Sequence, residues 1–306
     1  MFPKRFSIQS SALALALLAT AAPAFGEETT KLTFEASAGV AGDSNVGVPD
    51  LDQNTDQGDV ALLLRGKIQL DGKPTEKLVL RGGYEASQTS YQDFGAFNLT
   101  THRGFAEAEY DFDVVKTGML ANYVHARLSG DGYLDYIQVS PNVSKLFGDK
   151  LFLRGAYVRT EKDFKTSDGR DASGDAGRLD AFYFFDGTRQ YVTFGSEAGS
   201  EDAESDLFDL DHTSAKGAYV QRFGMVGRDA KMRLGAEIEQ RNYDAVDPEI
   251  EARREDQIVS ATGDLEVPLY WSVSMALGYE YRDRSSNLDS ADYDEHVGSV
   301  ELKVAF

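Results

Sequence analysis

Charged side chains recur at every second position in several segments of this 306-residue chain. Across residues 231–241 they take most of the odd positions, while the even positions are largely apolar. Such a charged face can act in two ways. If the segments are strands of a barrel, the basic residues can guide anionic solutes through it while acidic residues on the opposite wall focus the electric field. Alternatively, ion pairs between neighbouring strands can satisfy the charges inside a narrow barrel. We expect structural pairing for most of the candidates, which are Arg65, Lys67, Arg81, Arg154, Arg233, Glu237, Glu239, Arg241, Glu280 and Arg282.

Acidic residues gather in the expected loops, for example at residues 50–59 and 201–211. Carboxylates there can hold divalent cations that bridge to lipopolysaccharide phosphates, because hard cations prefer oxygen ligands. Asp50-x-Asp52-x-Asn54 begins like a calcium-binding loop, but Thr55 stands where the glycine of the tight turn belongs. We therefore expect solvated acidic loops.

Residues that carry catalysis are sparse. The chain has four histidines, and none has a recognisable Ser or Asp partner motif. It has no cysteine, which excludes a disulfide scaffold and a thiolate metal site. A net charge of -20 argues against nucleic acid as a partner. We expect no enzyme, cofactor or metal site, although separate strands of a barrel can assemble a triad, as in a lipid-modifying enzyme.

Period-two alternation continues almost to the last residue and indicates strands. Several strands exceed the usual globular length and match the roughly 9–11 residues that cross a bilayer. The expected strands lie near 31–42, 58–70, 77–89, 98–111, 117–128, 133–146, 150–161, 177–187, 190–199, 212–223, 230–243, 255–266, 270–282 and 293–306. The predicted fold is all-β, a transmembrane antiparallel up-and-down β-barrel of about 14 strands, with 12–16 open because alternation weakens at 98–128 and 177–223.

Expected connections alternate in length. Those at 71–74, 112–115, 148–149, 187–189 and 267–269 are short, whereas those at 43–57, 162–176, 200–211, 244–254 and 283–292 are long and polar. Short periplasmic turns that alternate with longer external loops are typical of outer-membrane barrels.

The first residues predict export. Lys4 and Arg5 precede an apolar run that is too short to span a membrane, and a small-x-small pattern follows at residues 22–24. We predict a signal peptide over 1–24, cleavage near 24–26, and a single barrel domain over 27–306. At the other end, alternate residues of the last strand share one face and finish at Phe306, which we interpret as the signal for the barrel-assembly machinery.

Two short motifs carry a family resemblance. Asp43-Ser44-Asn45-Val46 after the first strand, and Ser286-Asn287 after the thirteenth, resemble elements of the putative beta-barrel porin type 2 group and of the C-terminal barrel of surface lipoprotein assembly modifiers. The resemblance implies a fourteen-strand outer-membrane barrel that follows a helical-repeat domain, a domain not expected here because the first strand starts so early. The same residues also suit turns, since Asp, Ser and Asn bond their own backbone.

The predicted function is a porin-like passive pore, or a conduit for envelope or exported material, in the bacterial outer membrane. The alternative is a non-porous accessory barrel for surface lipoprotein or surface protein assembly. Expected partners are outer-membrane lipid and lipopolysaccharide, the assembly machinery during biogenesis, and a small solute or exported cargo.

Overall fold

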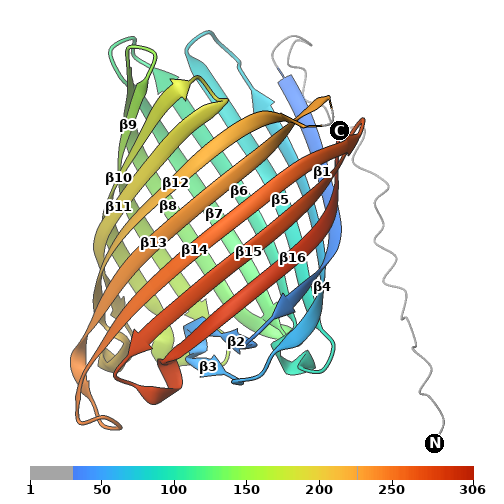
Figure 1. Cartoon of the computed structure of the whole chain (residues 1–306). Helices are drawn as coiled ribbons and strands as arrows, with labels where there is room; N and C mark the ends of the chain where they lie inside the picture. Colours follow the sequence, from blue (N-terminus) through green and yellow to red (C-terminus); the bar gives the residue numbers. More distant parts are fainter. Residues whose placement is uncertain (1–29, 226) are drawn as a thin grey trace, which may run out of the picture.

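Fourteen antiparallel strands close into one barrel in the computed structural model, which describes residues 30–225 and 227–306 (Figure 1). The expected signal peptide and its cleavage site lie outside the described residues. Each barrel strand pairs with the next along the chain, and the last pairs with the first, which confirms the predicted fold class. The strands are β1 (Thr30–Asp43), β4 (Asp59–Gly72), β5 (Leu78–Tyr91), β6 (Leu99–Asp111), β7 (Lys116–Leu128), β8 (Asp131–Phe147), β9 (Leu151–Phe164), β10 (Ala172–Asp186), β11 (Gln190–Ala203), β12 (Leu210–Met225), β13 (Arg228–Asp247), β14 (Ala252–Tyr270), β15 (Val273–Ser286) and β16 (Tyr293–Ala305).

Alternation explains why these segments form the wall. Successive side chains of a strand point to opposite faces, so an amphipathic strand presents one apolar face and one polar face. On β13, Leu234 and Ile238 are exposed on the outside, whereas Arg233 and Glu237 line internal cavities. Because unpaired backbone groups cannot lie in hydrocarbon, a wall of such strands must close on itself.

The closing seam joins β1 to β16. Phe34 and Phe306 exchange two backbone hydrogen bonds, with N···O distances of 3.1 and 2.9 Å. Further along the seam, Ala41 lies opposite Ser299 and Asp43 opposite Val297. The chain's last residue is therefore part of the ring.

Strand ends differ from the prediction at the loop end of the barrel. β10 begins at Ala172 rather than near 177, and the expected loop at 244–254 is only the turn 248–251 between β13 and β14. β7 and β8 are joined by Ser129 and Gly130 alone, both with positive φ (52° and 93°), which suits a tight hairpin. These strands continue past the apolar band into residues that are polar on both faces, so alternation no longer marks them.

Exposed aromatic side chains gather at the short-turn end of the barrel. Aromatic rings concentrate at membrane interfaces, so this group marks one limit of the lipid-facing band. It includes Tyr110, Phe112, Phe147, Tyr270, Trp271 and Phe306, whereas the exposed Tyr84, Tyr123, Tyr157 and Tyr279 lie near the middle of their strands. Across residues 30–225 and 227–306, no helix has the length and apolar character of a membrane span.

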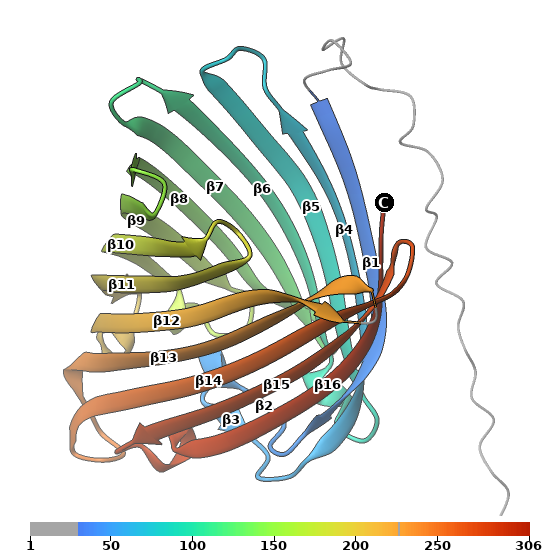
Figure 2. The same ribbon diagram turned by 45° about the horizontal axis from the view of Figure 1, so that its top comes forward.

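Short elements fill the loop end. They are the two-stranded sheet of β2 (Gly47–Val48) and β3 (Gln53–Asn54), and the one-turn 3-10 helices η1 (Pro49–Leu51), η2 (Gly95–Phe97), η3 (Asp168–Arg170), η4 (Asp206–Phe208) and η5 (Asp289–Ala291). Figures 1 and 2 show β2 and β3 within the ring of strands at this end.

Candidate functional site

Residues 44–58, which connect β1 to β4 and are called the mouth segment below, turn inward across the loop end of the barrel. Asn45 holds the root of this segment: its side-chain amide donates to the Asp294 carbonyl (3.2 Å), and its side-chain oxygen accepts from the backbone N–H of Asp56 (2.9 Å). Val46, whose side chain is fully buried, exchanges backbone hydrogen bonds with residues 55 and 57. The segment is therefore a folded unit.

One side of the mouth segment packs on the wall formed by β7, β8 and β9. Val48 belongs to a buried apolar cluster with Ala126, Tyr133 and Phe164. The Tyr133 hydroxyl also donates to a carboxylate oxygen of Asp50 (3.3 Å). Burial of this cluster holds the segment against the wall through the hydrophobic effect.

The other side of the segment carries Asp52 into a group of arginines. Arg254 of β14 donates to both carboxylate oxygens of Asp52 (2.7 and 3.0 Å). Arg284 of β15 lies 2.9 Å from the same carboxylate, and Arg170 of η3 donates at 2.7 Å. Asp256 of β14 accepts from Arg254 and Arg284 as well, at 2.7–3.2 Å. We call Arg170, Arg254 and Arg284 the arginine cluster.

Burial makes these ion pairs costly to break, so they hold the mouth segment in place. The side chains of Arg254 and Arg284 are 4% and 2% exposed, and that of Asp256 is 0% exposed. Tyr243 stacks on the Arg254 guanidinium, with 4.5 Å from its carbon to the ring centre. Removing one partner from a buried ion pair leaves an uncompensated buried charge, which is strongly destabilising.

The contacts of the mouth segment lie on opposite walls. Tyr133 belongs to β8 and Arg284 to β15, and these strands are seven places apart in the fourteen-strand ring whichever way they are counted. A segment anchored to both crosses the mouth along a diameter. This crossing places the mouth segment in the path through the loop end of the barrel.

The arginine cluster fixes the charge state of Asp52. Burial alone would raise the pKa of this carboxyl, but the hydrogen bonds from Arg254 and the charges of Arg254, Arg284 and Arg170 outweigh burial and hold the pKa well below its usual range. Asp52 is thus an anion from mildly acidic to neutral pH. The expectation of a solvated acidic loop is wrong for this residue.

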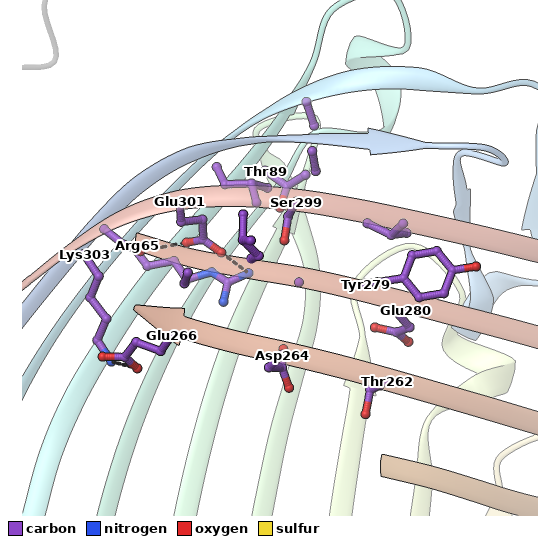
Figure 3. Close-up of a pocket in the computed structure, with 18 of the residues that line it drawn as sticks. Arg65, Thr89, Thr262, Asp264, Glu266, Tyr279, Glu280, Ser299, Glu301 and Lys303 are labelled. Carbon is purple, nitrogen blue, oxygen red and sulfur yellow. Dashed lines mark hydrogen bonds and ion pairs between the residues drawn. The ribbon is translucent and has the colours of Figure 1, made fainter. Parts of the chain in front are cut away.

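Below the mouth segment, the described residues line cavities in the lumen. The largest, about 850 Å³, is bordered by β1, β4, β5 and β13 to β16; in Figure 3, Arg65 faces Glu301 and Lys303 lies beside Glu266. A second cavity of about 400 Å³ lies against β9 to β14. A third, of about 290 Å³, is lined by the mouth segment itself, together with Arg170 and Arg284.

Seven of the ten charges singled out from the sequence take part in ion pairs. The pairs are Arg65–Glu301 (3.6 Å), Arg81–Asp71 (2.6 Å), Arg81–Glu107 (2.6 Å), Arg154–Asp180 (2.9 Å), Arg241–Glu239 (2.7 Å), Arg282–Glu280 (2.9 Å) and Arg282–Glu295 (3.7 Å). Within the described part of the chain, Lys67, Arg233 and Glu237 have no ion-pair partner within 4.0 Å, and each lines a cavity.

The residues of the family-like motifs form turns at the seam and beside the arginine cluster. Asp43 accepts from the Asn45 backbone N–H (2.9 Å) and the Tyr91 hydroxyl (2.7 Å), and Ser44 accepts from the His296 backbone N–H (2.8 Å). The Ser286 hydroxyl donates to Asp256 (2.6 Å).

Asn287 accepts from the backbone N–H of Glu255 (2.9 Å) and donates to the carbonyl of Arg253 (2.9 Å). Both motifs thus hold the elements that meet at the mouth.

Sequence reasoning missed the arginine cluster. It grouped Asp52 with the other loop acids, and it assigned no site role to Asp256 or to any of the three arginines. A signal did exist: Arg254 and Asp256 share one face of β14, and Arg284 continues the inward face of β15. That signal could not show that a segment 200 residues earlier supplies the missing carboxylate. Among residues 30–225 and 227–306, no group of three His, Cys, Asp or Glu side chains is arranged to hold a metal ion.

Comparisons with solved structures place this fold among outer-membrane barrels. The anion-selective porin from Comamonas acidovorans matches with a TM-score of 0.54 and 10% identity, covering 91% of this chain and 99% of the porin. The outer membrane channel DcaP of Acinetobacter baumannii matches with a TM-score of 0.52 and 7% identity, covering 92% and 98%. OmpT, an outer membrane protein of Vibrio cholerae, matches with a TM-score of 0.51 and 10% identity, covering 90% and 98%.

At these identities the likeness shows the fold, which is that of an outer-membrane barrel. Among curated protein sequences, no significant match is found. The family model described as surface lipoprotein assembly modifier matches residues 76–306, which cover all the barrel strands from β5 to β16. The chain is therefore an outer-membrane barrel that belongs to the surface lipoprotein assembly modifier family.

Proposed function

We propose that this protein is an accessory barrel for the assembly of surface lipoproteins, with its external mouth closed at rest. One observation carries the proposal: the mouth segment is anchored to β8 on one wall and to β14 and β15 on the other. A general diffusion pore needs a continuous water path, and a segment fixed across the diameter obstructs that path. The family match supplies the cargo class.

The closed mouth and the large cavity suit such a role together. The cavity of about 850 Å³ extends to residues near the short-turn end, including Glu35, Lys231 and Lys303. In a barrel whose short turns face the periplasm, this space is available to cargo from the periplasmic side. The closed loop end meanwhile preserves the permeability barrier. The role is non-enzymatic and needs no cofactor.

The test is a deletion strain of the parent bacterium. We expect surface-exposed lipoprotein to fall, as measured by protease shaving of intact cells, while total lipoprotein in lysates stays constant. Complementation with the wild-type gene restores the surface signal. Unchanged shaving profiles in the deletion strain would refute the proposal.

A porin-like pore is the second candidate, and a specific observation favours it. Lys67 and Arg233 face cavities without an ion-pair partner in the described residues, as a path for anionic solutes requires. Planar bilayers separate the two functions. Discrete channel events from the wild-type barrel in chloride support the pore, and a silent bilayer supports the closed accessory barrel.

A further inference from the structure

The mouth segment is held by a group of side chains that resembles an occupied binding site. Arg170, Arg254 and Arg284 converge on the two carboxylate oxygens of Asp52 at 2.7–3.0 Å. Paired donors of this kind match the geometry of a carboxylate or a phosphate. Phe208 fixes the Arg170 guanidinium from its other side, 4.1 Å from the ring centre. The arginines are therefore oriented by the barrel and its loops, and Asp52 is the group they bind.

We propose that the arginine cluster is an oxyanion-binding site that Asp52 occupies from within the same chain, and that a phosphate- or carboxylate-bearing ligand arriving through the lumen displaces Asp52 and releases the mouth segment. This proposed site does not depend on whether the barrel is an accessory assembly protein or a pore.

Charge balance explains why release requires a ligand. If Asp52 withdraws alone, Arg254 and Arg284 remain buried with Asp256 as their shared carboxylate. Two buried guanidiniums and one carboxylate leave a net positive charge in a poorly solvated place, which is unfavourable. An entering oxyanion restores the balance. A ligand that binds only the released state shifts the population toward that state.

Cations without ion-pair partners lead from the large cavity to the cluster. Arg233 lines both the cavity of about 850 Å³ and that of about 400 Å³. Lys216 lines the cavity of about 400 Å³ and that of about 290 Å³, which also contains Asp52, Arg170 and Arg284. In the described ranges, neither Arg233 nor Lys216 has a carboxylate within 4.0 Å, so both are available to an anion moving up the lumen.

Phosphate binding to the purified barrel in detergent tests the site. Calorimetric titration with inorganic phosphate, and separately with acetate, compares wild type with Asp52→Asn, which removes the competing charge at nearly constant shape. We expect the variant to bind one or both oxyanions roughly tenfold or more tightly, because its site is no longer filled in cis. The stronger of the two identifies the preferred ligand group. Adding Arg170→Ala to this variant should abolish the increase in oxyanion affinity.

Asp50→Asn is the matched control. The Asp50 side chain accepts a hydrogen bond from Tyr133 and has no ion pair with an arginine of the cluster in the described residues. Arg170 donates to the Asp50 backbone carbonyl (2.9 Å), which this substitution keeps, so the variant should bind like wild type. Heat-modifiable gel migration reports that each barrel is folded.

A second measurement uses the wild-type chain. Saturating phosphate should increase cleavage of the mouth segment by the endoprotease Asp-N, which cuts before Asp50, Asp52 and Asp56. Equal oxyanion affinity in wild type and Asp52→Asn, or cleavage that phosphate leaves unchanged, overturns the proposal. Loss of surface lipoprotein in a deletion strain is a separate readout, so failure of the assembly role does not imply failure of this site.

Discussion

Asp52 accepts two hydrogen bonds from Arg254, a residue 202 positions later in the chain, at 2.7 and 3.0 Å. The pair joins a connection between the first two barrel strands to a strand two places from the closing seam. Through this pair, the connection is held across the barrel mouth.

Replacing Arg254 with Ala should release the mouth segment. Removing one partner of a buried ion pair costs about 3–5 kcal/mol. Cleavage of an opened segment follows its open population, so digestion by Asp-N should accelerate by roughly a hundredfold or more. Arg253→Ala is the control, because Arg253 has no ion pair within the described residues. Equal cleavage of the two variants would show that the cluster does not hold the segment.

Mild acid should leave the mouth closed. The arginine cluster holds the pKa of Asp52 below its usual range, so the carboxylate contributes stability above the unfolded pKa of about 3.9. That contribution is lost only as the pH falls through the lower, folded pKa. Conductance of the wild-type barrel in planar bilayers should be unchanged from pH 7 to pH 4. An opening midpoint near pH 5 would contradict this assignment.

A disulfide should form across the seam. The chain has no cysteine, and Ala41 of β1 lies opposite Ser299 of β16. Because Phe34 and Phe306 exchange hydrogen bonds, this odd-numbered pair is not hydrogen-bonded, and its Cα atoms lie within disulfide range, about 4.5 Å apart. Ala41→Cys with Ser299→Cys should therefore cross-link on mild oxidation. Ala41→Cys with Val300→Cys should not, since Val300 points to the other face; cross-linking of the second pair instead would mean a shifted register.

The outer and inner faces of β16 should differ in their tolerance of charge. Val300 is exposed on the outer face, whereas Ser299 lines the largest cavity. An arginine on the lipid face costs about 2–4 kcal/mol at the bilayer midplane. Val300→Arg should lose that much free energy of unfolding in lipid vesicles, and Ser299→Arg much less. Equal losses would place both residues in the same environment.

Phe306 should matter more for assembly in the cell than for stability. The residue is 77% exposed, while its backbone N–H and carbonyl, which any residue supplies, pair with Phe34. Phe306→Ala should reduce the amount of barrel in outer-membrane fractions, yet leave refolding into detergent almost unchanged. Phe112→Ala, at an exposed aromatic on a short turn, is the control. Normal membrane levels of Phe306→Ala would remove the assembly-signal interpretation.

The wall of the barrel was predictable because it depends on local pattern. In β13 the alternation of Leu234 and Ile238 with Arg233 and Glu237 fixes both the extended conformation and the face that meets lipid. Prediction weakened where strands leave the apolar band. Residues 172–176 are polar or small on both faces, so only pairing with β9 and β11 extends β10 to Ala172.

The sequence also predicted which charged residues line the lumen, but it did not predict which of them pair with one another. Alternation placed Arg154 on the inward face, yet its partner Asp180 lies 26 positions later in the chain, on the next strand β10. Pairing depends on the stagger between strands, which the register of the closed ring sets.

Sequence alone determined that this chain forms a closed, lipid-facing wall with a charged interior, since a strand's two faces are encoded at every second residue. Only the tertiary structure decided that the lumen is crossed. Asp52, Arg170, Arg254 and Arg284 come from four separate parts of the chain, and each is an ordinary polar residue in its own segment. They meet because ring closure brings the mouth segment, which connects the first two barrel strands, beside the last strands. Once buried, each charge must be paired with an opposite charge.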